Sequence, residues 1–240
     1  MSQETRAGRL GVGVVGAGRV GPVLALALAG AGHALTGVSA ISEVSRERAD
    51  TLLPGVPILE VPEVVRRSEL VIFAVPASEL VALVQGLTDV GAWQAGQLVL
   101  HTAPDYGYGV FAPALAAGVI PLALHPAMVF TGTSLDLTRL TGATVAVTAP
   151  APVLPIGQAL TVEMGAEPVV IAEDDRPAYA ESIAAATAFS RAVVRQATDA
   201  LRQIGVDRPD HVVGGLVRAA VEEELRAAAG LADTGGLSDV

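Results

Sequence analysis

The stretch VVGAGRVG, Val14 to Gly21, lies between a short apolar run and a longer one that begins at Pro22. It contains G-x-G-x-x-G, because Gly16 and Gly18 precede Gly21 at that spacing. The run before the motif predicts a strand, and PVLALALAGAG after it predicts a helix. There the first glycine permits a tight turn, the second lets a pyrophosphate approach the backbone, and the third lets the helix pack on the strand. The pattern predicts a dinucleotide site whose phosphates face free N–H groups at the helix start.

Two further residues of the motif, Arg19 and Val20, belong to the predicted site. Arg19 either contacts the pyrophosphate or points into water. The alternative to a dinucleotide site is a glycine-rich turn that binds nothing. The strand before the glycines and the helix after them favour binding, because the pattern is informative only in that context.

The end of the second predicted strand decides between NAD and NADP. An NAD site carries an Asp or Glu there, about twenty residues after the glycines. Residues 37–40 contain no acid, whereas Ser39, Ser42 and Arg46 are available, and arginine with hydroxyls suits a 2′-phosphate. The sequence therefore predicts NADP. The alternative is that Arg46 and Arg48 form only the solvated face of a short helix, with Glu43 as a late substitute for the acid.

The composition of the 240-residue chain excludes several partners and chemistries. A hydrophobic content of 51% allows a sizeable core, and a formal net charge of -10 offers no basic field for nucleic acid or an anionic membrane. Cysteine is absent, which removes disulfides, thiolate nucleophiles and cysteine ligands, and we expect no metal site. Lysine is absent too, which removes Schiff-base chemistry and lysine acids. A small molecule is the expected ligand.

The chain shows no sign of a secretion signal or a membrane segment. Its first ten residues, MSQETRAGRL, have no apolar signal core. The longest apolar stretch, 23–34, is too short and too interrupted by glycine to span a bilayer. We therefore expect a cytoplasmic protein.

Apolar runs of five to seven residues alternate with longer amphipathic stretches, which is typical of a parallel sheet with helices on both faces. The expected fold class is α/β: a Rossmann-type, doubly wound, mainly parallel sheet followed by a small all-helical domain. The expected strands are 10–15, 34–39, 58–59, 70–75, 97–102, 120–125, 143–148 and 168–172. The expected helices include 22–31, 62–67, 78–86 and 152–164.

After Glu173 the sequence becomes rich in alanine and loses its strand signals, which predicts a long helix to about residue 206 and a second over 209–229. We place a domain boundary there, with a dinucleotide-binding domain over 1–173 and a short helical domain over 174–240. Alanine recurs along the long helix and allows close packing against another subunit, which predicts a homodimer. The last ten residues are expected to fray.

Two histidines end predicted strands, at the edge where ligands of an open parallel sheet bind. His101 ends the strand in QLVLHTAPD, and His125 ends the strand in IPLALHPAMVFTG. Both are candidate catalytic residues, because imidazole moves protons near neutral pH. If His125 is the proton donor, we expect the rate to depend on its ionisation near the ordinary pKa of about 6.5. The alternative for each is a structural histidine that bonds a backbone carbonyl. His33 and His211 are expected to be structural or solvated.

The glycine motif, AVPASEL, HTAPDYG, LALHPAMVFTG and LDLTRLTG together resemble a known family. It consists of bacterial Rossmann-like proteins with a C-terminal domain of unknown function, number 2520. They are distant relatives of the 6-phosphogluconate dehydrogenase and β-hydroxyacid dehydrogenase superfamily. The resemblance covers about residues 10–206 and implies NADP-type binding, an oxidoreductase-like fold and a helical domain that usually dimerises. Val75 and Pro76, within AVPASEL, are also among the predicted cofactor-binding residues.

The chain departs from that family at several places. It has HTAP at 101–104 where the family usually reads H-T-S-G, and TAF at 187–189 where the family tends to read S-N-Y. Its C-terminal domain is also short. The wider superfamily commonly uses a lysine and an asparagine on the long helix to polarise a substrate carbonyl, and this chain has neither residue. Any reduction must use other donors.

Three classes of function remain, in order of preference. The first is an NADP-dependent oxidoreductase of a small molecule, in which His125 or His101 supplies the proton that follows hydride transfer. The residues expected to orient its substrate are Thr102, Thr131, Ser190 and Arg191. The second is a hydride exchanger similar to deazaflavin-dependent NADP oxidoreductases, which needs no dedicated acid. The third is a non-catalytic NADP-binding sensor or scaffold.

Overall fold

The computed structural model describes residues 9–235, so most of the N-terminal stretch examined for a signal core lies outside the described residues. The chain forms two compact units, residues 1–181 and 182–240. In chain order, the elements are β1 (Gly11–Val15), α1 (Gly21–Gly30), β2 (Ala34–Ser39), α2 (Glu43–Leu52), α3 (Val61–Arg66), β3 (Leu70–Phe73), α4 (Ala77–Asp89), β4 (Leu98–His101), the 3-10 helix η1 (Tyr108–Ala117), β5 (Ile120–Pro126), α5 (Leu135–Leu140), β6 (Thr144–Thr148), α6 (Leu154–Glu163), β7 (Glu167–Val170), the 3-10 helix η2 (Glu173–Asp175), α7 (Arg176–Gln203) and α8 (Pro209–Gly235).

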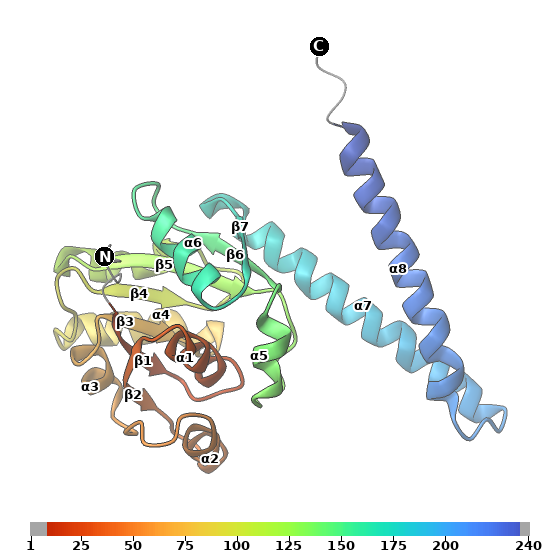
Figure 1. Cartoon of the computed structure of the whole chain (residues 1–240), viewed down its shortest axis with the longest axis horizontal. Helices are drawn as coiled ribbons and strands as arrows, with labels where there is room; N and C mark the ends of the chain where they lie inside the picture. The colour runs from red at the N-terminus through yellow and green to blue at the C-terminus, as the bar shows by residue number, and fades with distance from the viewer. Residues whose placement is uncertain (1–8, 236–240) are drawn as a thin grey trace, which may run out of the picture. The chain divides into compact units, whose positions relative to one another are not determined.

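The first unit is built on a seven-stranded sheet with the order β2-β1-β3-β4-β5-β6-β7 (Figure 1). Neighbouring strands from β2 to β5 are parallel, β6 is antiparallel to β5, and β7 is parallel to β6. The predicted α/β class, with a mainly parallel sheet and a helical C-terminal region, is confirmed. Because β1 to β5 run the same way, the glycine motif and both strand-end histidines lie at one edge of the sheet.

Alternate residues of each central strand pack into separate cores on the two faces. In β3, Leu70 and Ile72 face the core that contains residues of α1, α5 and α6. Val71 and Phe73 face the other core, which contains residues of α3, α4 and η1. Both faces are thus covered, which explains why the central strands read as continuous apolar runs. His101 follows Val99 by two residues, so its ring lies on the face of the second core.

Most predicted elements agree with the structure to within a few residues, and two differ. The strand expected at 58–59 is only an isolated bridge between Val38 and Ile58. The helix α8 continues through Gly235, so residues 231–235 of the expected frayed tail are helical, and the rest of that tail lies outside the described residues. Strand pairing between residues 58–59 and β2 is limited to this one bridge, because Pro57 and Pro62 flank the segment and cannot donate backbone hydrogen bonds to a ladder.

The second unit holds most of α7 and all of α8, and large apolar side chains on both helices are exposed. The division between the units falls inside α7, and the boundary that we placed after residue 173 stays a prediction.

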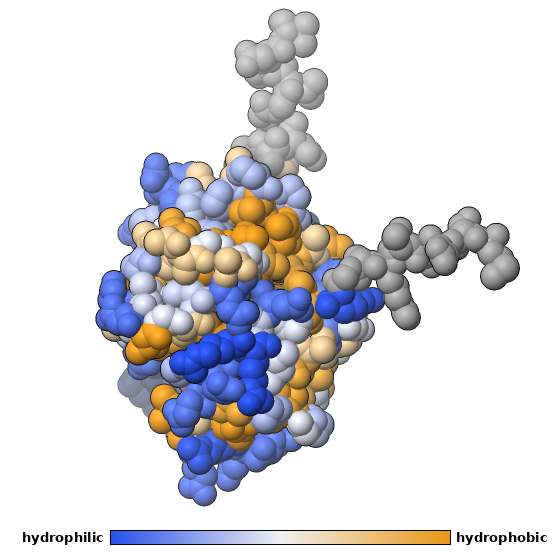
Figure 2. Space-filling view, turned by 90° about the vertical axis from the view of Figure 1, so that its left-hand side faces the viewer, coloured by the Kyte–Doolittle hydropathy of each residue, from blue (hydrophilic) through white to orange (hydrophobic). Residues whose placement is uncertain are grey.

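Within residues 9–235, no helix combines the length and hydropathy that a membrane crossing needs. On the face in Figure 2, hydrophilic residues form a central patch with small hydrophobic groups around it.

Candidate functional site

Each glycine of the G-x-G-x-x-G motif has the surroundings that its predicted role requires. Gly16 has φ 103°, and an added Cβ would lie 2.6 Å from the carbonyl oxygen of Ala74. A Cβ on Gly21 would overlap the carbonyl oxygen of Gly16, because α1 begins directly against the strand. A Cβ on Gly18 would meet no protein atom within 4 Å. Of the three motif glycines, only Gly18 therefore faces open space, as the predicted close approach of a pyrophosphate would need.

That space is a cavity of about 570 Å³ at the carboxyl ends of β1, β2 and β3. It brings together six of the predicted cofactor residues, namely Gly16, Gly18, Ser39, Ser42, Val75 and Pro76. Apolar residues of α3 and α4 form its far wall. The first turn of α1 has no side-chain cap, but Pro22 has no N–H and the N–H groups of Val23 and Leu24 donate to the carbonyl oxygen of Val20. The donors that an anion could reach are therefore those of the glycine loop before the helix, residues 18–21. A flat apolar ring with a phosphate at the glycine loop suits this lining.

The end of β2 is organised by hydroxyl groups. Ser39 accepts a hydrogen bond from the N–H of Gly16 at 3.1 Å, which ties β2 to the glycine loop. Ser42 is the N-cap of α2 and accepts from the N–H of Ser45. Arg46 does not line the same cavity: it borders a neighbouring hollow together with Ala40 and residues 58–60 and 63. Arg46 therefore lies near the end of β2, but it faces this neighbouring hollow and not the cavity that Ser39 and Ser42 line.

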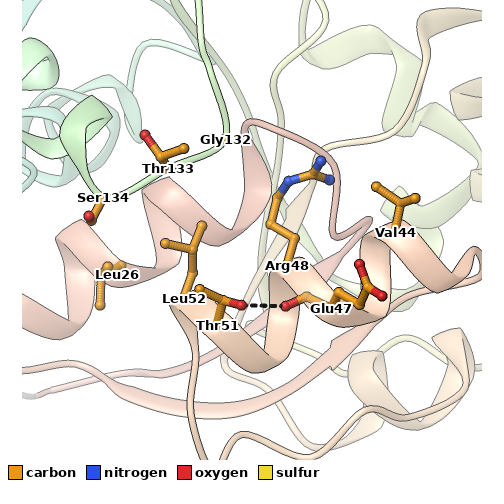
Figure 3. Close-up of a pocket in the computed structure, with 9 residues that line it drawn as sticks. All are labelled: Leu26, Val44, Glu47, Arg48, Thr51, Leu52, Gly132, Thr133 and Ser134. Atoms are coloured by element: carbon orange, nitrogen blue, oxygen red, sulfur yellow. Dashed lines mark hydrogen bonds between the residues drawn. The ribbon is translucent and has the colours of Figure 1, made fainter.

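Arg48 on α2 contacts two loops that are far apart in the sequence, the glycine loop and the segment around Gly132. Its Nη1 donates to the carbonyl oxygen of Ala17 at 3.1 Å, so the guanidinium holds the glycine loop. A Cβ on Gly132 would lie 2.8 Å from Arg48 Nε and about as close to Arg19. Figure 3 shows Arg48 on α2 and Gly132 on the facing segment, around a hollow of about 430 Å³. The segment after His125 is thereby packed against the glycine loop.

A buried carboxylate shapes that segment. Asp136, which is fully buried, accepts from the backbone N–H groups of Thr131 and Gly132, both at 2.8 Å. It also accepts from the hydroxyl of Thr131. Gly132 has φ 79°, which a side chain would disfavour. These contacts explain the TGTSLD sequence, and they occupy the Thr131 hydroxyl that we assigned to substrate.

His101 has no exposed surface, and backbone groups satisfy both of its ring nitrogens. Its Nδ1 accepts from the N–H of Ala103 at 3.2 Å, and its Nε2 donates to the carbonyl oxygen of Gly107 at 2.9 Å. Phe111 packs on the ring. Burial lowers the pKa of His101 to about 4, with Arg176 adding to the shift. The imidazole is neutral at pH 7, and it holds the loop after β4.

His125 is only partly buried, and it meets a residue from a distant part of the chain. Its Nδ1 lies 2.8 Å from the hydroxyl of Tyr179, in the first turn of α7. Within the described part of the chain, its Nε2 has no hydrogen-bond partner. Burial lowers the pKa of His125 to about 4, assisted by Arg176 and opposed by Asp105. The expectation that His125 ionises near pH 6.5 is therefore wrong, because its ring is largely removed from water and lies near the Arg176 guanidinium.

Arg176 is a buried cation beside these rings. Its Nε donates to the hydroxyl of Thr148, and its Nη2 donates to the carbonyl oxygens of Ala123 and Ala146. Its Cζ lies 5.8 Å from the ring centroid of Tyr179. In residues 9–235 its Nη1 has no partner, and no carboxylate lies within ion-pair distance of it.

Glu173 fastens the same region to the loop after β4. Its carboxylate accepts from the N–H groups of Tyr108 and Gly109 at 2.9 and 2.8 Å. A side chain on Gly107 would overlap the Glu173 carboxylate. Gly107 and Gly109, the glycines of DYGYG, are therefore needed because a side chain at either position would clash with this carboxylate.

The other predicted substrate residues are less constrained. The backbone of Thr102 donates to Phe73 at the end of β3. Ser190 and Arg191 are exposed on α7 in the helical unit. Their roles stay predictions. Tyr179 and Arg176 were not predicted from the sequence. Nothing in the helical pattern around RPAY indicates that the first turn of α7 contacts β5, more than fifty residues earlier in the chain.

Comparisons with known proteins agree with this architecture. The model of the Rossmann-like domain matches residues 1–126, and the model of a domain of unknown function (DUF2520) matches residues 143–238. No curated protein matches the sequence.

Several solved structures share the fold. An imine reductase from Pseudomonas sp. is 18% identical, with TM-score 0.69 over 95% of this chain and 79% of that one. A pyrroline carboxylate reductase from Plasmodium falciparum, solved with NADP bound, is 13% identical, with TM-score 0.60 over 91% and 79%. A 3-hydroxyisobutyrate dehydrogenase from Mycobacterium tuberculosis is 16% identical, with TM-score 0.62 over 86% and 71%. At these identities the likeness concerns the fold.

Proposed function

This chain belongs to the Rossmann-like family, and from that premise we propose that it is an NADP-dependent oxidoreductase of a small organic molecule. The observation that carries the proposal is the open face of Gly18, which lines a cavity at the glycine loop just before α1. At Gly16 and Gly21, protein atoms occupy the space that a side chain would need, whereas at Gly18 that space is open. A pyrophosphate fits there because it needs backbone donors and no intervening side chain. The similar structures named above include one solved with NADP.

Calorimetric titration with NADPH and NADH tests this binding site. We expect heat of binding in the parent protein and none in Gly18→Val, whose side chain would occupy the phosphate position. The matched control is Gly86→Val, since Gly86 lies on α4, outside the cavity lining, and a Cβ there also meets open space. Absence of binding with both cofactors would contradict the proposal.

The preference for NADP rests on the end of β2. No acid ends β2 to bond a ribose 2′-hydroxyl; Ser42 and Ser45 line the cavity, and Arg46 borders the neighbouring hollow, where it would meet a 2′-phosphate that extends beyond β2. A charged hydrogen bond to the phosphate contributes about 1.5 to 3 kcal/mol, so Arg46→Ala should narrow the preference about tenfold or more. Arg202→Ala, which removes an exposed arginine of the helical unit, is the control. Equal affinities for NADP and NAD in the parent would contradict this preference.

The chemistry follows from the two ring nitrogens of His125. A reduced nicotinamide supplies a hydride. The neutral Nε2–H of His125 would donate to the substrate oxygen or nitrogen on which negative charge develops, as a neutral imidazole can. His101 has no free nitrogen, so we assign it to holding the loop after β4 rather than to proton transfer. Thr102, which follows β4 directly, is the candidate orienting group, whereas the Thr131 hydroxyl already donates to Asp136.

Oxidation of NADPH in the presence of small ketones, imines or a deazaflavin identifies the class of reaction. Turnover with ketones or imines supports the proposed oxidoreductase. Turnover with the deazaflavin alone would instead support a hydride exchanger. Tight NADPH binding without turnover on any of these would support a sensor or scaffold.

We further propose that the protein is a homodimer built on its C-terminal helices. Phe189 on α7 is 71% exposed, and Leu216 and Leu225 on α8 are 70% and 65% exposed. Large apolar side chains gathered on one unit are expected to be covered by another chain. Light scattering at micromolar concentration should give a dimer, and Phe189→Arg should shift it toward a monomer. A monomeric parent protein would contradict this assignment.

A further inference from the structure

We propose that Tyr179 is a positioning residue for His125, whose ring it holds with Nδ1 as acceptor and Nε2 protonated. As Nε2 gives its proton to the substrate, the Tyr179 hydroxyl would give its own proton to Nδ1. The second statement rests on the proposed function, whereas the first concerns the protein alone. Neither residue type nor spacing in the sequence links the two side chains.

The two rings meet edge to face within the first unit. Their centroids are 5.6 Å apart at an interplanar angle of 76°. The hydroxyl oxygen lies 2.8 Å from Nδ1, which is an ordinary hydrogen-bond length. Tyr179 stands in the first turn of α7, and the hydrogen bonds of Arg176 to β5 and β6 anchor that turn to the sheet.

Counting partners decides which atom donates. In the described part of the chain, the Tyr179 hydroxyl and the His125 Nδ1 are each other's only hydrogen-bond partner, and Nε2 has none. With the proton on Nδ1, the phenol hydrogen and the Nε2 lone pair would both lack protein partners. With the phenol donating, only Nε2–H lacks one. The second arrangement satisfies more groups, and it leaves the N–H at Nε2 available as a donor.

The charges around the pair favour the same direction. Burial raises the pKa of Tyr179, and the nearby Arg176 guanidinium opposes that rise. The guanidinium also disfavours a protonated His125, whereas the Asp105 carboxylate favours it. A cation beside a phenol stabilises negative charge on its oxygen, so it makes the hydroxyl a better donor. Arg176 therefore stabilises the phenolate that the transfer leaves, and it favours a relay in which the imidazole never carries a positive charge.

The resulting step balances without an imidazolium. The substrate C=O or C=N carbon receives the hydride, and its oxygen or nitrogen takes the proton from Nε2. The N–H bond at Nε2 breaks as a new one forms at Nδ1 with the phenol proton. Tyr179 is left as a phenolate that faces Arg176. Nε2 then takes a proton from water while Nδ1 returns its proton to the phenolate, which restores the starting tautomer. The relay delivers one hydride and one proton at a pH where both histidines are neutral.

Nitrogen NMR of protein with ¹⁵N-labelled histidine tests the tautomer. The His125 signals are assigned by their loss in His125→Gln. We expect Nδ1 unprotonated and Nε2 protonated in the parent protein. In Tyr179→Phe the Nδ1–H tautomer should gain several-fold in population, whereas Tyr106→Phe, which removes a hydroxyl outside the site, should leave the ring unchanged. Unaltered His101 signals verify that each variant is folded.

A parent protein with the proton on Nδ1, or a Tyr179→Phe spectrum identical to the parent, would overturn the proposal. Turnover in H₂O and D₂O mixtures then tests the relay. We expect a curved dependence on deuterium fraction in the parent and a linear one in Tyr179→Phe, with turnover about tenfold lower and the KM for NADPH unchanged, the factor that one ordinary hydrogen bond supplies. A linear dependence in the parent would refute the relay. If NADPH is not oxidised at all, the proposed function fails, and the NMR result still decides the tautomer.

Discussion

His101 and His125 end neighbouring parallel strands, on the same face of one sheet, yet they occupy opposite chemical situations. His101 is fully buried, and the loop that follows its own strand satisfies both nitrogens. His125 is partly exposed, with one nitrogen bonded to α7 and the other without a partner in residues 9–235. A strand-end histidine is thus made structural or reactive by what packs over it. The predictions below test this difference, beginning with the largest expected effect.

Replacing His125 should affect chemistry more than folding. In His125→Gln we expect turnover to fall about a hundredfold or more, because a positioned proton donor contributes at least that factor. NADPH affinity should change little. Steady-state kinetics of NADPH oxidation and calorimetry give the two quantities, and a variant with parental turnover would remove the distinction between the histidines.

Acid should destabilise the protein through the same two rings. Both folded-state pKa values are about 4, below the ordinary value of 6.5. Between these values the unfolded chain binds more protons, so stability is complete above about pH 6.5 and declines as the pH falls toward 4. For buried His101 the loss is at most about 3 kcal/mol. Urea unfolding across this range measures it, and His101→Ala should flatten the slope.

Replacing His101 should affect folding more than chemistry. His101→Ala leaves the buried carbonyl oxygen of Gly107 without its donor, which costs about 1 to 3 kcal/mol. Urea unfolding at pH 7.5 measures this loss. Turnover per folded molecule should remain within a few-fold of the parent, and a hundredfold loss would instead place His101 in the chemistry.

The smallest effect concerns the carboxylate that holds the loop around His101. Glu173→Gln keeps the shape but removes the charge that accepts from Tyr108 and Gly109. We expect a loss of about 1 kcal/mol in unfolding free energy, the difference between charged and neutral hydrogen bonds. Asp174→Asn, a neighbouring exposed acid, is the control. Equal stability of both variants would show that the loop needs no charge.

Much of the architecture was predictable because its signals are local. Strand-length apolar runs indicated a buried parallel sheet, and the glycine spacing indicated the turn between β1 and α1. The bridge at Ile58 was overestimated as a strand, because an apolar dipeptide does not reveal how many ladder bonds its neighbours allow. The cofactor residues after β2 were predicted as a group, and the structure separated Arg46 from the cavity that Ser39 lines.

The sequence by itself determined the sheet, the glycine loop and the positions of both histidines, since periodicity and turn chemistry depend on residues a few places apart. Only the tertiary structure decided which histidine keeps a free nitrogen. That outcome depends on Arg176 and Tyr179 reaching β5 from the start of α7, and on the loop after β4 closing over His101. Burial and the neighbouring guanidinium then lower both pKa values, because the charge of an imidazole depends on the groups that surround it in space.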